Sequence, residues 1–167
     1  MDRNMRDFVH YIAEYAQLPS VRHDLRSGIG KRMERAPQMH PHVASWTRPS
    51  MEHETEAYYC VAALIAHRPN QAIPTGHAGD LGASLARAVF LAVDTRENWL
   101  RLLSRQPATR ITTTLGRIVP SLIDSGVPVD FVRLLDDLAA WPRHHRRIIA
   151  RWNQSFYRIL HPVNLPH

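Results

Sequence analysis

Arginine side chains recur at helical spacing in the second half of this sequence. Arg110 and Arg117 are seven residues apart, an interval that places two side chains on one side of a helix. Guanidinium groups stay charged, and their planar fork matches phosphate oxygens. The spacing therefore predicts a basic surface suited to a nucleic-acid backbone, with an ordinary solvated helix face as the alternative. Arg147, Arg151 and Arg158 are spaced four and seven apart, opposite an apolar face near the C-terminus. Arg96, Arg101 and Arg105 line the helix expected just before Arg110.

The basic charge is concentrated in one half of the chain. The 167 residues include 21 Lys and Arg against 15 Asp and Glu, for a net charge of +6. Residues 1–95 hold 10 basic and 10 acidic residues, whereas residues 96–167 hold 11 basic and 5 acidic residues. A GC-rich genome would explain why all basic residues but Lys31 are Arg, but not this segregation. A basic half predicts an acidic partner, which would be a nucleic acid, an anionic membrane or an acidic protein.

The eleven histidines form no recognisable metal site. His40 and His42 lie in a proline-rich segment, and the adjacent pair His144 and His145 cannot share one helix face. Cys60 is the single cysteine, so a zinc site built on paired cysteines is excluded. We therefore expect neither a metal nor a cofactor.

A metal phosphohydrolase is an alternative that one dipeptide leaves open. All-helical enzymes of that class carry an H…HD…D set. His23 and Asp24 would supply the central pair, with His10 upstream and Asp80 or Asp94 downstream. The interval between His10 and His23 is short for ligands from separate helices, and chance alone produces a two-letter match in a chain this rich in His and Asp.

Other catalytic patterns are missing from the sequence. Residues 28–32, GIGKR, lack the spacing of a phosphate-binding loop and follow no strand. No Ser-His-Asp or Cys-His arrangement is identifiable, and Cys60 fits the core of an apolar helix. We expect no enzymatic activity. Several aromatic side chains could stack on bases, but their helical spacing favours core packing: Tyr58, Tyr59, Trp141, Trp152 and Phe156.

Apolar periodicity predicts an all-α fold, a bundle of about seven to nine helices without a sheet. Phe8, Ile12 and Tyr15 follow the spacing of one helix face, and residues 52–66 form the strongest helical pattern. The remaining expected helices are a short one carrying Val21 and Leu25, then 80–93, a helix carrying Trp99 and Leu103, 109–125, 131–141, and a last helix opening at Pro142.

Capping residues and prolines set the expected boundaries. Pro19 ends the first helix, and Pro120 predicts a kink or break inside 109–125. Residues 36–50 contain three prolines and are expected to form an irregular loop. The expected N-caps are Ser20, Asp80 and Asp130, with a capping box formed by Asp94 and Glu97.

Length and composition fit one domain spanning residues 1–167, in which two sub-lobes would meet near residues 67–80. No apolar run approaches the roughly 18 residues that a membrane helix needs. The N-terminal residues MDRNMRDF lack the apolar region of a secretory signal. A single cysteine fits a reducing compartment. We therefore expect a cytoplasmic protein without a membrane partner.

Six segments, in order along the chain, resemble the CasB family, the small subunits of the type I-E CRISPR surveillance complex Cascade. The similarity covers nearly the whole sequence, and no single segment is a catalytic signature. The segments are FVHYIAEYA, LRSGIGK (residues 25–31), EAYYCVAALIA, DLGASLARA (residues 80–88), GVPVDFVRLLDDLAAW (residues 126–141) and RRIIARWNQSFY.

This resemblance implies an all-helical protein without enzymatic activity. Its implied partners are the other Cascade subunits, a second copy of itself packed head to tail, guide RNA, and the target and displaced DNA strands. The subunit would lie beside the guide RNA–target DNA duplex and help to hold the displaced strand. A separate nuclease-helicase would cut the target. The sequence departs from the family at two positions. Pro120 stands where the family usually continues a helix, and Ala86 stands where a basic residue is more usual.

The basic residues expected to contact nucleic acid combine the resemblance with the arginine spacing. Arg26 and Lys31 lie in the matched basic segment, Arg87 lies in DLGASLARA, and Arg143 opens the last helix. The complete set is Arg26, Lys31, Arg87, Arg96, Arg101, Arg105, Arg110, Arg117 and Arg143. A free-standing DNA-binding regulator, with 131–141 or the last helix as its reading helix, is the alternative function.

Overall fold

The computed structural model describes residues 3–163, and this part of the chain contains eight α-helices and no strand. The predicted all-α bundle of seven to nine helices is therefore confirmed. Short 3-10 turns join several of the helices. In chain order the α-helices are α1 (Arg3–Tyr15), α2 (Pro19–Arg26), α3 (His40–Val43), α4 (Glu52–His67), α5 (Leu81–Ala86), α6 (Val93–Ser104), α7 (Ile111–Asp124) and α8 (Phe131–Leu160).

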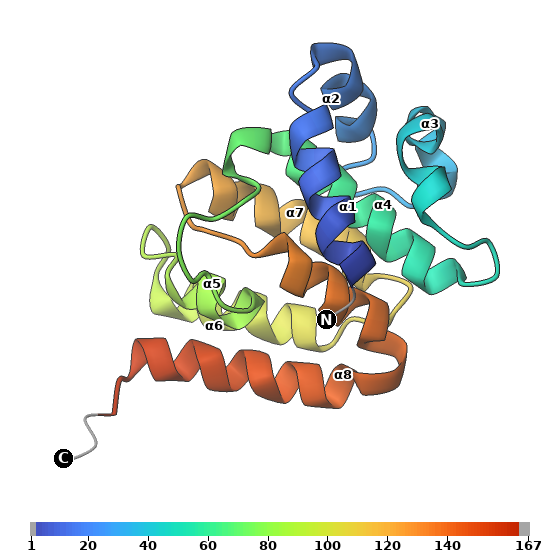
Figure 1. Ribbon diagram of the computed structural model, residues 1–167. Helices are drawn as coiled ribbons and strands as arrows, with labels where there is room; N and C mark the ends of the chain where they lie inside the picture. Colours follow the sequence, from blue (N-terminus) through green and yellow to red (C-terminus); the bar gives the residue numbers. More distant parts are fainter. Residues whose placement is uncertain (1–2, 164–167) are drawn as a thin grey trace.

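Helix α4 forms the centre of the core (Figure 1). Residues 55–66 are all buried, because this stretch is apolar on nearly every side and can be covered all round. Four helices cover α4, which packs against α1, α2, α7 and α8. Buried apolar side chains form one connected cluster that extends from Met5 in α1 to Phe156 in α8.

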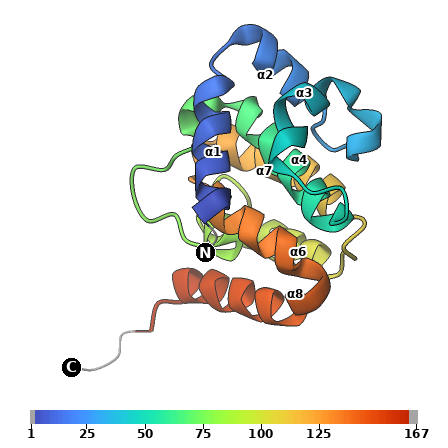
Figure 2. The same ribbon diagram turned by 45° about the vertical axis from the view of Figure 1, so that its right-hand side comes forward.

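Helix α8 is bent into two arms by non-helical dihedral angles at His144 (φ −132°, ψ 21°). Pro142 has no backbone N–H, so the carbonyl of Leu138 loses its usual helical donor. A ring nitrogen of His53 in α4 replaces it, with Nε2 2.7 Å from that oxygen. The predicted opening of a new helix at Pro142 is thus displaced to His144. Figures 1 and 2 show the first arm (orange) inside the bundle and the second arm (red) along its lower edge.

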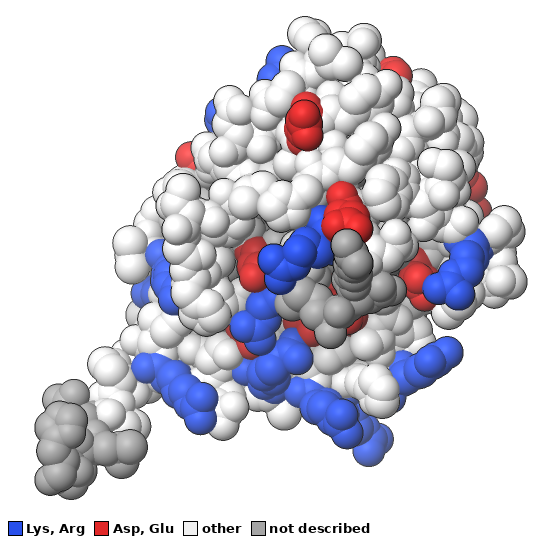
Figure 3. Space-filling model, viewed as in Figure 1, with Lys and Arg blue, Asp and Glu red and all other residues white. Residues whose placement is uncertain are grey.

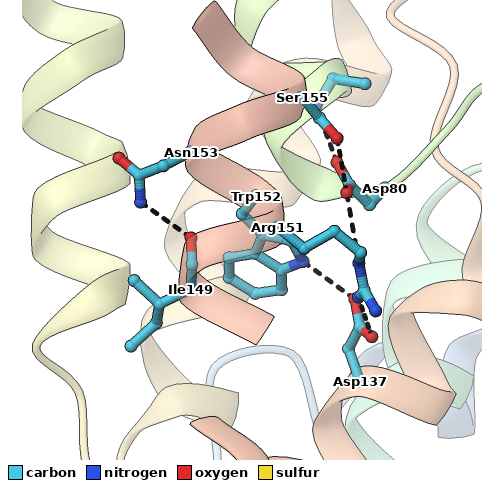
Figure 4. Close-up of polar contacts among 8 residues, drawn as sticks. Asp80, Asp137, Ile149, Arg151, Trp152, Asn153 and Ser155 are labelled. Atoms are coloured by element: carbon cyan, nitrogen blue, oxygen red, sulfur yellow. Dashed lines mark hydrogen bonds and ion pairs between the residues drawn. The ribbon is translucent and has the colours of Figure 1, made fainter. Parts of the chain in front are cut away.

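A polar network holds the two arms of α8 together (Figure 4). Trp152 Nε1 in the second arm donates to Asp137 Oδ2 in the first at 2.8 Å, and Arg151 pairs with the other oxygen of that carboxylate. Ser155 Oγ donates to Asp80 Oδ2 at 2.8 Å, and Arg151 Nε lies 3.4 Å from the same oxygen. Asp80 is also the N-cap of α5, as predicted. The network therefore joins α5 to both arms.

Some predicted boundaries are confirmed and others are wrong. Asp130 caps α8 as predicted, by accepting hydrogen bonds from the first backbone N–H groups. Ser20 does not cap α2, because Pro19 occupies the first turn and Leu18 precedes it. The capping box of Asp94 with Glu97 is also wrong: α6 begins earlier, after Ala92, with no side-chain cap.

Three segments differ from the pattern read in the sequence. The helix expected over 80–93 ends at Ala86, and residues 36–50 contain two 3-10 turns and α3 instead of an irregular loop. The break expected at Pro120 is also wrong, because α7 continues through it. Burial of Ile118, Val119 and Leu122 on either side of the proline offsets the lost hydrogen bond, which costs roughly 3 kcal/mol in an isolated helix.

Candidate nucleic-acid interface

Two hollows adjoin at the connection between α6 and α7. The first, of about 400 Å³, is lined by Leu102, Gln106, Arg110, Thr113, Thr114, Arg117 and Ile118. The second, of about 470 Å³, is lined by Ser104, Arg105, Gln106, Pro107, Ala108, Trp141, Pro142 and His145. Gln106 lines both, and we call the two adjoining hollows together the basic trough. Among these lining residues none is acidic, so nothing on its walls offsets the three arginines.

The main chain of the α6–α7 connection is held at several points. Trp141, buried at the end of the first arm of α8, donates from Nε1 to the carbonyl of Gln106 at 3.0 Å. Thr113 and Thr114 donate from their hydroxyls to the carbonyl of Arg110, at 2.9 and 3.1 Å. These bonds fix the backbone from which Arg105 and Arg110 project, so their charges are carried on an ordered segment.

The loop after α2 packs directly on α7. A Cβ atom on Gly116 would lie 2.4 Å from the Cα atom of Gly30, so the two backbones meet without a side chain between them. Gly30 has φ +72°, a conformation that favours glycine. The residue after each glycine, Lys31 and Arg117, is exposed. The fold thus brings Lys31 next to the segment that carries Arg117, 86 positions later in the chain.

Four of the nine predicted residues come together at or beside the basic trough: Lys31, Arg105, Arg110 and Arg117. All four are exposed. Arg26 is exposed at the C-terminal end of α2, five residues before Lys31. This grouping combines the loop after α2 with α7, which no periodicity in the sequence relates to each other.

Two predicted residues serve the fold instead of a surface. Arg96 is only 7% exposed, and its Nη1 donates to the carbonyl of Ala86 at 2.6 Å. Arg87 is half-buried and donates to the carbonyl of Ala78. Both side chains satisfy carbonyl groups around α5. The expectation that Arg96 meets a nucleic-acid backbone does not agree with its burial.

Arg101 and Arg143 are exposed but lie among polar or acidic neighbours. Arg101 donates to Asn98 Oδ1 at 2.9 Å and lies 3.8 Å from a carboxylate oxygen of Glu97. Arg143 borders another hollow, where Glu52 and Glu54 also contribute to the lining. Carboxylates close to these two arginines reduce the local positive potential relative to the basic trough.

The C-terminal arginine stripe is divided by the fold. Arg151 turns inward to Asp80 and Asp137, whereas Arg147 and Arg158 are exposed. Figure 3 shows Lys and Arg side chains gathered along the lower edge of this face, where the second arm of α8 runs. The exposed arginines of this arm and its bend are Arg143, Arg146, Arg147 and Arg158.

Residues that sequence reasoning missed include Arg32, Gln106 and His145. Arg32 follows Lys31 directly, and its Nη1 donates to the carbonyl of Thr109, the residue before Arg110, at 2.9 Å. Its position directly after the matched LRSGIGK segment was the feature of the sequence that could have identified it. Gln106 and His145 line the trough without any spacing that would have revealed them.

The residues of the alternative functions are engaged elsewhere. Asp24 Oδ2 lies 3.0 Å from His42 Nε2, and Asp80 belongs to the polar network of α8. The His and Asp residues of the phosphohydrolase alternative are therefore not brought together. Within residues 3–163 no group of three or more His, Cys, Asp or Glu side chains could hold a metal ion. Burial raises the pKa of Cys60 to about 12, so its thiol stays protonated at neutral pH.

The two segments proposed as reading helices differ in exposure. The first arm of α8 buries most of its length, including Phe131, Leu135 and Trp141, and so cannot enter a DNA groove. The second arm exposes arginines but is tied to the first by Asp137.

A span through a membrane is not possible for any helix of the described chain, because none combines the necessary length and apolarity.

The chain is similar in sequence and in fold to known CRISPR-associated proteins. The family model of the CRISPR-associated protein Cse2 matches residues 21–157. A curated relative, the CRISPR-associated protein Cse2 of Thermus thermophilus, is 28% identical over 79% of this chain and 78% of its own. A chain of a solved CRISPR RNA-guided surveillance complex is 31% identical, with a TM-score of 0.83 over 95% of this chain and 94% of its own. The crystal structure of CasB from Thermus thermophilus is 26% identical, with a TM-score of 0.72 over 94% and 99%.

Proposed function

The chain belongs to the Cse2 (CasB) family, as its sequence indicated, and we propose that it is the small subunit of a CRISPR surveillance complex and binds nucleic-acid backbone without catalysing a reaction. The partners in this proposal are the other subunits, a second copy of the chain, guide RNA, and the target and displaced DNA strands. The complex would work in the cytoplasm, in antiviral defence.

The observation that carries this proposal is the basic trough with its adjoining loop. Arg105, Arg110 and Arg117 lie on walls that carry no carboxylate among the described lining residues. The loop that carries Lys31, from a distant part of the chain, packs on α7 next to Arg117. Phosphate contacts of this kind add affinity and position the nucleic acid without reading its sequence. Sequence recognition is then left to base pairing with the guide RNA.

The energetics of strand exchange explain why such a subunit would matter. Replacing a DNA duplex by a guide RNA–DNA duplex is nearly balanced in free energy, so backbone contacts can tip the equilibrium. Arginine suits the task because its charge is permanent and its fork fits phosphate. No catalytic step is part of this proposal, and target cutting would belong to a separate protein.

Co-expression with the other complex subunits and a guide RNA tests the assembly. We expect this chain to co-purify in a ribonucleoprotein of defined mass. Charge reversal of Arg105, Arg110 and Arg117 to Glu should leave assembly intact and weaken target DNA binding. Arg68→Glu is the control, because Arg68 is also exposed but already pairs with Asp124 at 2.7 Å. A complex that forms without this chain, or binds target DNA equally well with the three reversals, would contradict the proposal.

A further inference from the structure

A buried carboxylate, Glu56, lies on the central helix α4 where the loop after α2 covers it. Glu56 is 4% exposed and lies in α4, in a stretch of twelve buried residues that carries no other charge. Burying a carboxylate is costly unless it is paired and hydrogen-bonded. Oε2 accepts a hydrogen bond from the backbone N–H of Met33 at 3.2 Å. Oε1 accepts no hydrogen bond within the described residues, and Arg32 Nη2 lies 3.3 Å from it.

The guanidinium of Arg32 connects three segments of the chain. Nη2 faces Glu56 in α4, and Nη1 donates to the carbonyl of Thr109 in the α6–α7 connection at 2.9 Å. The side chain itself comes from the loop after α2. Two exposed carboxylates, Glu34 and Glu52, are more distant, at 3.9 and 4.0 Å. Arg32 therefore pairs its charge with the buried Glu56 while one of its N–H groups donates to the α6–α7 connection.

The two ends of this contact adjoin residues of the proposed interface. Lys31 directly precedes Arg32, and Arg110 directly follows Thr109. The Gly30–Gly116 contact holds the same loop to α7 on its other side. The Arg32 contact, together with the Gly30–Gly116 contact, thus constrains how the backbone of Lys31 is placed relative to that of Arg110. Burial also raises the pKa of Glu56, against the opposing effects of the Met33 hydrogen bond and the Arg32 charge.

We infer that Arg32 and Glu56 are positioning residues, which set the spacing between Lys31 and Arg110 so that both can contact one nucleic-acid backbone. This inference rests on the proposed function of the trough. Phosphates along one strand have a fixed separation, so two cations on separate segments bind together only if the protein fixes their distance. A planar guanidinium that forms an ion pair on one side and donates a hydrogen bond on the other fixes this distance at little cost in side-chain freedom.

Glu56→Gln separates positioning from simple electrostatics. The substitution removes a negative charge, so electrostatics alone predicts equal or tighter binding. Positioning predicts weaker binding by about three- to tenfold, the loss of up to one phosphate contact. Glu52→Gln is the matched control, because it removes an exposed carboxylate near the same guanidinium and should bind as the wild type does. The measurement is fluorescence anisotropy of the full chain with labelled mixed-sequence single-stranded DNA, alongside thermal unfolding.

Arg32→Lys is the second variant, for the case that Glu56→Gln does not fold. It keeps the positive charge but cannot bond to both Glu56 and Thr109 in a fixed fork, so binding should weaken in the same way. In the background of Lys31→Ala with Arg110→Ala, neither variant should weaken binding further, because the contact acts through those two cations. An undiminished effect in that background would overturn the inference.

The outcomes distinguish this inference from the proposed function. If Lys31→Ala and Arg110→Ala leave binding unchanged, the basic trough is not the interface and the proposed function fails. If those variants weaken binding while Glu56→Gln and Arg32→Lys do not, the interface stands and the positioning role is overturned. If all four weaken binding and the effects are not additive, both hold.

Discussion

Gly116 of α7 and Gly30 of the loop after α2 are in backbone contact: a Cβ atom on Gly116 would lie 2.4 Å from both the Cα and the N atom of Gly30. Backbone atoms cannot move aside as the end of a flexible side chain can. The contact therefore packs the loop that carries Lys31 against α7, next to Arg117 of the basic trough.

Gly116→Ala should destabilise the protein by about 1–3 kcal/mol, because the added methyl group overlaps the backbone of Gly30. The intrinsic helix propensity of Ala would recover up to about 1 kcal/mol. Gly76→Ala is the control, since a Cβ atom there meets nothing within 4 Å. Chemical denaturation measures both variants. Equal unfolding free energies for Gly116→Ala and the wild type would mean that the two segments separate without cost.

Asp137→Ala should lower the unfolding free energy by about 2–3 kcal/mol, because Arg151 loses its main partner and the buried Trp152 N–H loses its acceptor. Arg151 is partly exposed, so the loss should stay below that of a fully buried pair. Asp136→Ala, at the exposed neighbouring position, should change stability by less than about 0.5 kcal/mol. Similar unfolding midpoints in urea for the two variants would contradict the importance of this network.

Arg96→Met should affect stability and not DNA binding, whereas Arg110→Met should affect DNA binding and not stability. Arg96 is buried and bonded to the carbonyl of Ala86, so its loss should reduce the melting temperature and leave the salt dependence of DNA binding unchanged. Arg110 is exposed in the trough, so its loss should spare stability and reduce the slope of log K against log salt by about 1. Binding titrations at several salt concentrations and thermal unfolding compare the two. A reduced slope for Arg96→Met would place that residue on the interface.

Asp124 should make folding stability depend on pH in the acid range. Hydrogen bonds from Arg68 and then His67 to its Oδ1, at 2.7 and 2.8 Å, hold the pKa of this carboxyl below its usual value of 3.8. A lowered folded-state pKa contributes stability above the unfolded-state pKa, and this stability is lost as pH falls through the folded value. Asp124→Asn should therefore be less stable than the wild type at neutral pH, and the gap should close below pH 3.8. Urea denaturation across this range measures it. A gap that widens with acid would reverse the assigned direction.

Much of the fold was readable in the sequence, for local reasons. Helical periodicity, an apolar stretch at residues 52–66 and the caps Asp80 and Asp130 depend on neighbours a few positions away. The family, too, was recognisable from ordered short segments, and the model match over residues 21–157 confirms it. Boundaries failed where packing overruled a local signal, as at Pro120, whose helix is kept intact by the buried side chains around it.

By itself, the sequence determined the helical class, the central helix and a surplus of arginine in the second half, because spacing along a helix determines which side chains share a face. Only the tertiary structure decided which faces are covered. It buried Arg96, turned Arg151 toward Asp137, and placed Gly30, the neighbour of Lys31, against the helix of Arg117. The physical reason is that a guanidinium can donate to a carbonyl, a carboxylate or a phosphate, and the packing of distant segments determines which of them lies within reach.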